Sequence, residues 1–143
     1  MRVFPAVLFF VISCGVAPPT LCPGCTPRQQ DSLQTALEAV AGKDALNCGT
    51  VEEGAASEKA IAVQQQCISN AIASGKRFIA KRQPMGVDSL VVYAVAGNGA
   101  GAVSYFFFDS SPCGATDCGE RIVAKSCASP VLSPERSGGY TCH

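Results

Sequence analysis

The cysteines constrain this chain most, because 143 residues contain nine of them and each disulfide fixes which two segments lie together. An even set of cysteines can close completely into bridges, whereas an odd set leaves one over. Disulfides persist in oxidising compartments outside the cytosol. The count therefore predicts an exported chain in which one cysteine has a different role.

The beginning of the chain suggests which cysteine that is. Met1-Arg2 gives a positive start, and an apolar run from Val3 to Ile12 follows. The run is too short to cross a bilayer as a helix, which takes about 20 residues, but it suits the apolar part of a secretory signal. It ends at Val11-Ile12-Ser13-Cys14, which resembles the lipobox of bacterial lipoproteins: an aliphatic residue, a tolerant position, a small residue and cysteine.

This resemblance implies a lipid anchor at Cys14. In that family the chain is cut just before the cysteine, whose sulfur carries a diacylglycerol and whose new amine is often acylated, with palmitate as a common chain. We therefore expect a signal peptide at 1–13, a lipid anchor and tether at 14–25, and a single domain at 26–143. The protein would be held in the bacterial cell envelope, at the outer membrane or the periplasmic face. The alternative is cleavage after Gly15-Val16-Ala17, which would give a secreted protein.

With Cys14 lipidated, eight cysteines remain, enough for four disulfides. Their spacing favours local closures, namely Cys113 with Cys118 and Cys127 with Cys142. A bridge between Cys48 and Cys67 would tie a loop to the middle of a helix. The disulfide candidates are Cys22, Cys25, Cys48, Cys67, Cys113, Cys118, Cys127 and Cys142.

Helical periodicity marks the first half of the domain. Thr26-Pro27 forms a helix start, and Gly42 is placed to end that helix. A second helix is expected from Ala55 to Ser74, before Gly75. Its predicted inward stripe contains Ile61, Gln64, Cys67, Ile68, Ala71 and Ile72.

The second half changes to the period of strands. We expect strands at 77–82, 89–96, 102–108 and 121–126, and a short edge strand at 137–142. The strand at 89–96 is apolar on both faces, as a central strand would be, and 97–101 is its hairpin connection. Two helices followed by a run of strands predict an α+β fold. The two N-terminal helices would pack on one face of a four- to five-stranded antiparallel sheet stapled by disulfides.

Charge offers one candidate binding surface. The 11 Lys and Arg residues balance 11 Asp and Glu residues, so nothing argues for a nucleic-acid partner. Lys76, Arg77, Lys81 and Arg82 nevertheless cluster, and could present a basic patch to a protein or an anionic polymer. The competing interpretation is that edge strands carry Lys and Arg to prevent pairing with other chains. The aromatic run at 105–108 covers both faces of its strand, and burial on both sides is the commoner outcome.

Catalytic signals are weak by comparison. Cys22-Pro23-Gly24-Cys25 has the spacing of a redox motif, but no strand precedes it as in thioredoxin-like proteins. A zinc site made of Cys22, Cys25, Cys113 and Cys118 would compete with disulfides in an exported chain. We therefore expect no catalytic residue, metal or cofactor.

Together these observations predict a lipid-anchored cell-envelope protein that acts by binding or as a structural module. Two alternatives remain open. One is a small disulfide-stabilised inhibitor that blocks an envelope or foreign hydrolase with the loop at 110–119. The other is a periplasmic thiol-disulfide enzyme that uses Cys22 and Cys25.

Overall fold

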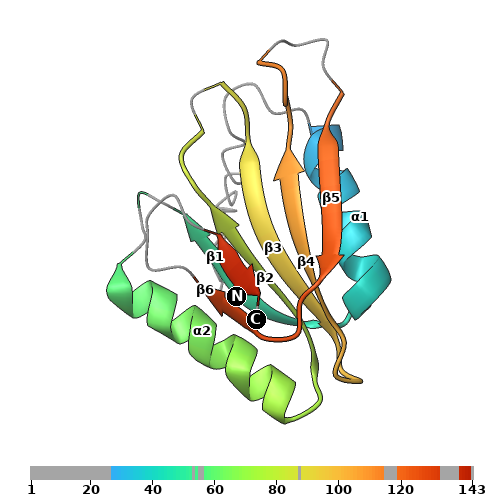
Figure 1. Ribbon diagram of the computed structural model, residues 1–143, viewed down its shortest axis with the longest axis vertical. Helices are drawn as coiled ribbons and strands as arrows, with labels where there is room; N and C mark the ends of the chain where they lie inside the picture. Colours follow the sequence, from blue (N-terminus) through green and yellow to red (C-terminus); the bar gives the residue numbers. More distant parts are fainter. Residues whose placement is uncertain are drawn as a thin grey trace, which may run out of the picture.

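The computed structural model describes residues 27–52, 54, 57–86, 88–114, 119–132 and 139–142. The predicted signal peptide, Cys14, Cys22 and Cys25 lie outside these residues. Within these residues, two helices and seven strands follow one another (Figure 1). They are α1 (Pro27–Ala41), β1 (Leu46–Glu52), α2 (Glu58–Ala73), β2 (Arg77–Gln83), β3 (Val91–Asn98), β4 (Val103–Asp109), β5 (Arg121–Ser126), β6 (Pro130–Leu132) and β7 (Tyr140–Cys142).

The main sheet has five strands in the order β1-β2-β3-β4-β5. Strands β2 to β5 pair antiparallel, which confirms the α+β class and the antiparallel hairpins. Strand β1 is different, because it pairs parallel to β2 and α2 forms the crossover between them. The tail does not join this sheet as an edge strand, since β7 pairs with β6 in a separate two-stranded sheet.

Sequence periodicity missed two strands, β1 and the short β6. It missed β1 because Asn47-Cys48-Gly49 has the composition of a loop. The pairing of β1 with β2 shifts register between Asn47 and Thr50, and Gly49 has a φ of 88°. The Asn47 side-chain oxygen accepts a 2.8 Å hydrogen bond from the amide of Gly49. A β-bulge therefore accommodates the turn-forming residues inside a strand.

The two helices lie on opposite faces of the sheet, which corrects the expectation that both cover one face. Leu33 and Leu37 of α1 belong to a buried cluster with Phe108 and other residues on one side of the strands. Ile68 and Ala71 of α2 belong to a second cluster on the other side, with residues such as Phe78 and Val95. Strand β3 is apolar on both faces and contributes to both clusters, so each face needs its own cover.

Helix boundaries follow their capping residues. The amide of Gly42, at φ 83°, donates to the Glu38 carbonyl at 2.7 Å and ends α1 as predicted. The Ser57 hydroxyl accepts the amide of Ala60 at 3.1 Å, so α2 begins later than expected. Ile72, placed in the inward stripe by periodicity, is instead 40% exposed near the end of α2.

Two of the predicted disulfides are confirmed. Cys48 on β1 is bonded to Cys67 on α2, and Cys127 after β5 is bonded to Cys142 on β7. Cys113 is also disulfide-bonded, while its predicted partner Cys118 lies outside the described residues. These bridges indicate an oxidising, exported environment. Within the described part of the chain, no helix is long and apolar enough to cross a membrane.

Candidate functional site

A groove runs along the α1 face of the sheet, where α1 packs against β3 and β2 and the strip beside β1 is less covered. Two adjoining cavities of about 210 and 170 Å³ occupy this strip. Thr50 and Lys81 line both cavities, so we treat them as one feature, the α1 groove. It is lined by Leu33, Gln34, Lys43, Ala45, Asn47, Thr50, Glu52, Ile79, Lys81, Gln83, Leu90, Val92 and Phe108.

The alternation of strands brings the polar residues of the α1 groove to one face. Thr50 pairs with Lys81 and Glu52 pairs with Gln83 across the parallel strands β1 and β2. Residues two apart on a strand share a face, so these four side chains project toward α1. The groove is therefore built on paired positions of two strands rather than on a loop.

The two ends of the α1 groove differ in polarity. In the larger cavity, Leu33, Val92 and Phe108 are buried and form an apolar floor. The smaller cavity is bordered by polar side chains, including Gln34 and Lys43. The apolar part of an amphipathic molecule would match the larger cavity, and its polar part would match the smaller one.

Lys81 lies where these two environments meet. Its Nζ donates a 2.6 Å hydrogen bond to Oε1 of Gln34, whose Nε2 donates to Oε1 of Glu38 at 2.8 Å. Burial lowers the pKa of Lys81 below its ordinary value, and the charge of Glu38 offsets part of that effect. A partly desolvated ammonium interacts more strongly with an anion than an exposed one does.

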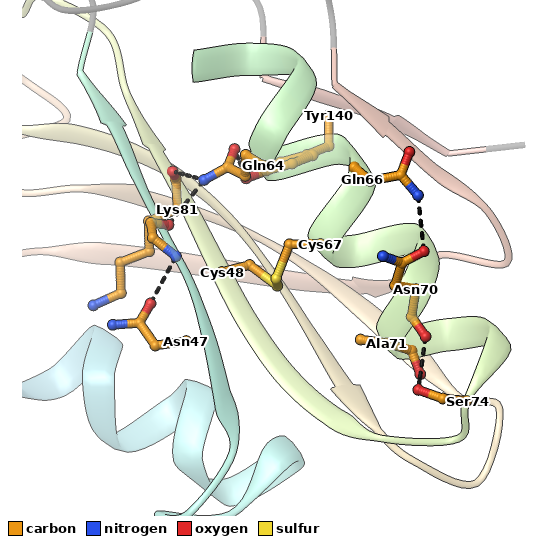
Figure 2. The surroundings of a disulfide bond; sticks show 11 residues. Asn47, Cys48, Gln64, Gln66, Cys67, Asn70, Ala71, Ser74, Lys81 and Tyr140 are labelled. Carbon is orange, nitrogen blue, oxygen red and sulfur yellow. Dashed lines mark hydrogen bonds between the residues drawn. A yellow bond between two sulfur atoms is a disulfide. The ribbon is translucent and has the colours of Figure 1, made fainter. Parts of the chain in front are cut away.

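A buried network on the other side of β1 and β2 holds this part of the sheet in place. Figure 2 shows Gln64 of α2 reaching the strand backbone, while the Lys81 side chain extends to the side away from α2. Nε2 of Gln64 donates to the carbonyls of Gly49 and Lys81 at 2.8 and 3.0 Å. The Tyr140 hydroxyl donates to Oε1 of Gln64 at 3.0 Å. Periodicity placed Gln64 on the inward face of α2, but nothing local in the sequence indicated these partners.

The predicted basic patch is divided by the fold. Lys76 and Arg77 are exposed and border a shallow depression with Asp44 and Leu46. Lys81 is half-buried in the α1 groove, whereas Arg82 is 1% exposed on the α2 face. The four side chains do not form one surface, because neighbouring residues of a strand point to opposite faces. The edge-strand interpretation does not hold either, since β2 lies between β1 and β3.

The aromatic run of β4 divides between the two faces. Phe106 and Phe108 are buried on the α1 side, while Tyr105 and Phe107 are only half-buried on the other. The Tyr93 ring lies 6.3 Å from that of Tyr105 and 5.5 Å from that of Phe107. Nζ of Lys125 is 4.9 Å from the Tyr105 ring centre, and burial raises the pKa of Tyr105 to about 12. We call Tyr93, Tyr105, Phe107 and Val123 the aromatic strip.

The proposed inhibitory loop is firmly held where it begins. The buried Ser110 hydroxyl accepts the amide of Leu90 at 2.8 Å, and the Ser110 amide donates to the Leu90 carbonyl at 3.0 Å. The amide of Ser111 donates to Oδ1 of Asp109 at 3.0 Å. Residues 112–114 are exposed, and 115–118 lie outside the described residues.

The described residues contain no group of three or more His, Cys, Asp and Glu side chains arranged to hold a metal ion. Cys22 and Cys25, which belong to the alternative zinc and redox sites, lie outside the described residues. The chain matches no protein-family model, no curated protein and no solved structure.

Proposed function

We propose that this chain is a lipid-anchored cell-envelope protein whose folded domain binds a small amphipathic molecule with an anionic group in the α1 groove. The observation that carries the proposal is the position of Lys81. Its ammonium is half-buried on the wall shared by both cavities, beside an apolar floor. A desolvated cation next to apolar surface is complementary to a ligand with an acidic head and an apolar body.

The dimensions of the α1 groove support a small ligand. The two cavities are about 210 and 170 Å³, and together they reach the lower end of the range of small-molecule sites, about 300–1,000 Å³. The acidic group would bind Nζ of Lys81 beside the Gln34 side chain. The apolar body would lie against Leu33 and Phe108.

A titration with matched probes tests the groove. Full-length protein in zwitterionic nanodiscs would be titrated with hexanoate and with hexylamine, which share an apolar chain and differ in charge. We expect hexanoate to bind and to shift the amide signals of Thr50 and Lys81. Lys81→Met should weaken this binding about tenfold or more, since it removes the cation and keeps the length of the side chain. Lys76→Met, at an exposed position outside the groove, is the matched control.

Two results would reject the groove as the site. Hexylamine could bind as tightly as hexanoate, or Lys81→Met could bind hexanoate normally. In either case charge at Lys81 does not select the ligand.

The anchor is tested separately, by intact mass on protein expressed from its full gene in a bacterial host. A mature chain that begins at Cys14 with added acyl mass is the expected result. Retention of residues 1–13, or a chain that begins after Ala17, would contradict it. Alkylation without reductant in the same experiment reports whether Cys22 and Cys25 are free thiols. A readily modified pair would favour the thiol-disulfide alternative.

Three observations favour the inhibitor alternative. Ser110 fixes the start of the loop through Leu90, Cys113 is disulfide-bonded, and residues 112–114 are exposed. A loop that is rigid before binding loses less entropy when it binds. Stoichiometric inhibition of a peptidoglycan hydrolase that is lost in Cys113→Ser would support this function. Equal inhibition by Cys113→Ser would show that this loop does not cause the inhibition.

A further inference from the structure

Strand β5 forms one edge of the five-stranded sheet, at the outer right in Figure 1. Among the described residues it pairs with β4 alone. All of its side chains except that of Ile122 are exposed. The outer edge of such a strand presents backbone N–H and C=O groups that can pair with another chain.

The side chains beside this edge form an ordered surface. Arg121, Val123 and Lys125 occupy every second position of β5, so their side chains lie on one face. This is the face of the aromatic strip, to which Val123 belongs. Val123 is 38% exposed and lies opposite Phe107, while Lys125 lies opposite Tyr105. The surface therefore has an apolar centre and a cation at each end of β5.

We propose that β5 and the aromatic strip bind an extended segment of a partner protein by strand addition. Residues at alternate positions of an added strand share a face, so three of its side chains would lie opposite Arg121, Val123 and Lys125. Charge complementarity sets their type: acidic, apolar and acidic, with one residue between each. The partner is thus a protein with an exposed segment in which two acidic residues flank an apolar one at alternate positions.

A second copy of this chain is a poorer occupant of the same edge. Antiparallel pairing of two β5 strands would gather both copies of Arg121 and Lys125 on one surface. Like charges across strands are destabilising. Cationic edge residues are known to guard against such self-pairing, and the same charges attract an acidic strand.

The one carboxylate opposite β5 on strand β4 is that of Asp109, which pairs with Arg121. Oδ1 of Asp109 accepts the amide of Ser111, so this carboxylate is also used within β4 and the turn that follows it.

Fluorescence anisotropy with a labelled peptide tests the proposal. The probe is acetyl-Thr-Glu-Thr-Phe-Thr-Glu-Thr-amide, and the protein is the full-length chain in zwitterionic nanodiscs. We expect binding that weakens as salt rises, because the charge pairs are exposed. The peptide with both Glu replaced by Gln should bind about tenfold more weakly. A peptide with N-methyl groups along one backbone edge should also lose binding, since strand addition needs those N–H donors.

Matched protein variants locate the surface. The double variant Arg121→Glu with Lys125→Glu should lose the peptide. Lys59→Glu with Lys76→Glu changes the net charge equally at exposed positions elsewhere and should keep it. Lys81→Met in the α1 groove should also keep it, which separates this proposal from the ligand proposal. Amide shifts in β5 on addition of the peptide would complete the expected result.

Several outcomes would overturn the proposal. These are absence of peptide binding, equal binding of the Gln peptide, tolerance of the N-methyl peptide, and binding that survives reversal of Arg121 and Lys125. A dimer in sedimentation that dissociates in the Arg121→Glu, Lys125→Glu variant would instead assign the edge to a second copy.

Discussion

The hydroxyl of Tyr140 donates a 3.0 Å hydrogen bond to the side-chain oxygen of Gln64, which joins residues 76 apart in the sequence. The same glutamine donates to the carbonyls of Gly49 and Lys81. One buried side chain therefore connects α2, β1, β2 and β7. Because Lys81 lines the α1 groove on the opposite face, this network also fixes the backbone on which the groove is built.

The first prediction concerns this network. Tyr140→Phe removes one hydrogen bond and should lower the free energy of unfolding by about 1–2 kcal/mol. Gln64→Leu should cost about 2–4 kcal/mol, since it leaves two carbonyls and the Tyr140 hydroxyl buried without their partner. Denaturant unfolding with disulfides intact measures both. A smaller loss for Gln64→Leu than for Tyr140→Phe would contradict the role given to Gln64.

The second prediction compares the two described disulfides. Their cysteines are 19 and 15 residues apart, so loop entropy predicts about 3 kcal/mol for each. Cys127 is also 1% exposed within the α2-side cluster, whereas Cys48 is only partly buried there. Replacing Cys127 and Cys142 by Ala should therefore destabilise more than replacing Cys48 and Cys67. The free energies of unfolding of the two double variants test this order. A larger loss for the Cys48 and Cys67 variant would show that packing around Cys127 adds little.

The third prediction concerns the close approach of Gly97 to Phe78 across β2 and β3. A methyl group at residue 97 would overlap the Phe78 ring, which is buried beneath α2. Gly97→Ala should cost about 1–3 kcal/mol because the buried ring must move. Gly119→Ala, where a methyl group meets nothing within 4 Å, is the control. Equal thermal stabilities of the two variants would show that the ring moves without penalty.

The fourth prediction is a loss of stability in alkali. The pKa of Tyr105 is raised from 10.0 to about 12, first by burial and then by the neighbouring Tyr93. A raised pKa in the folded state means that its contribution is complete below pH 10 and is lost as pH rises toward 12. Burial also raises the pKa of Tyr140, which acts in the same direction. Stability should therefore fall over this interval.

The ionisation of Lys81 changes folding stability in the opposite direction to that of the tyrosines. Its pKa is lowered by burial, so the cost of burying its charge is present at lower pH and is relieved as pH rises from that lowered pKa toward 10.5. Tyr105→Phe should make the alkaline loss of stability shallower, because one of the two tyrosine contributions is removed. Denaturant unfolding across this pH range measures the slope. An unchanged slope in Tyr105→Phe would show that Tyr105 does not ionise differently in the two states.

Local patterns predicted a good part of this structure. Thr26-Pro27 and Gly42 predicted the extent of α1, and the two-residue period predicted β2 to β5 near their observed bounds. The close spacing of Cys127 and Cys142 favoured their bridge, which the structure contains. These features depend on residues near one another in the chain, so propensity and periodicity are sufficient to find them.

The candidate sites depend on long-range pairing, and the sequence alone did not define them. Strand β1 contains a bulge and exists through its pairing with β2, which is separated from it by the whole of α2. The crossover between them places α2 on one face and leaves the other to α1. The alternation of side chains along β2 directs Lys81 and Arg82 to opposite sides. The sequence by itself predicted α1, α2, the strands β2 to β5, two of the bridges and an exported chain. Only the tertiary structure decided which face each element covers and where the groove lies, because a strand takes its hydrogen bonds and its burial from distant partners.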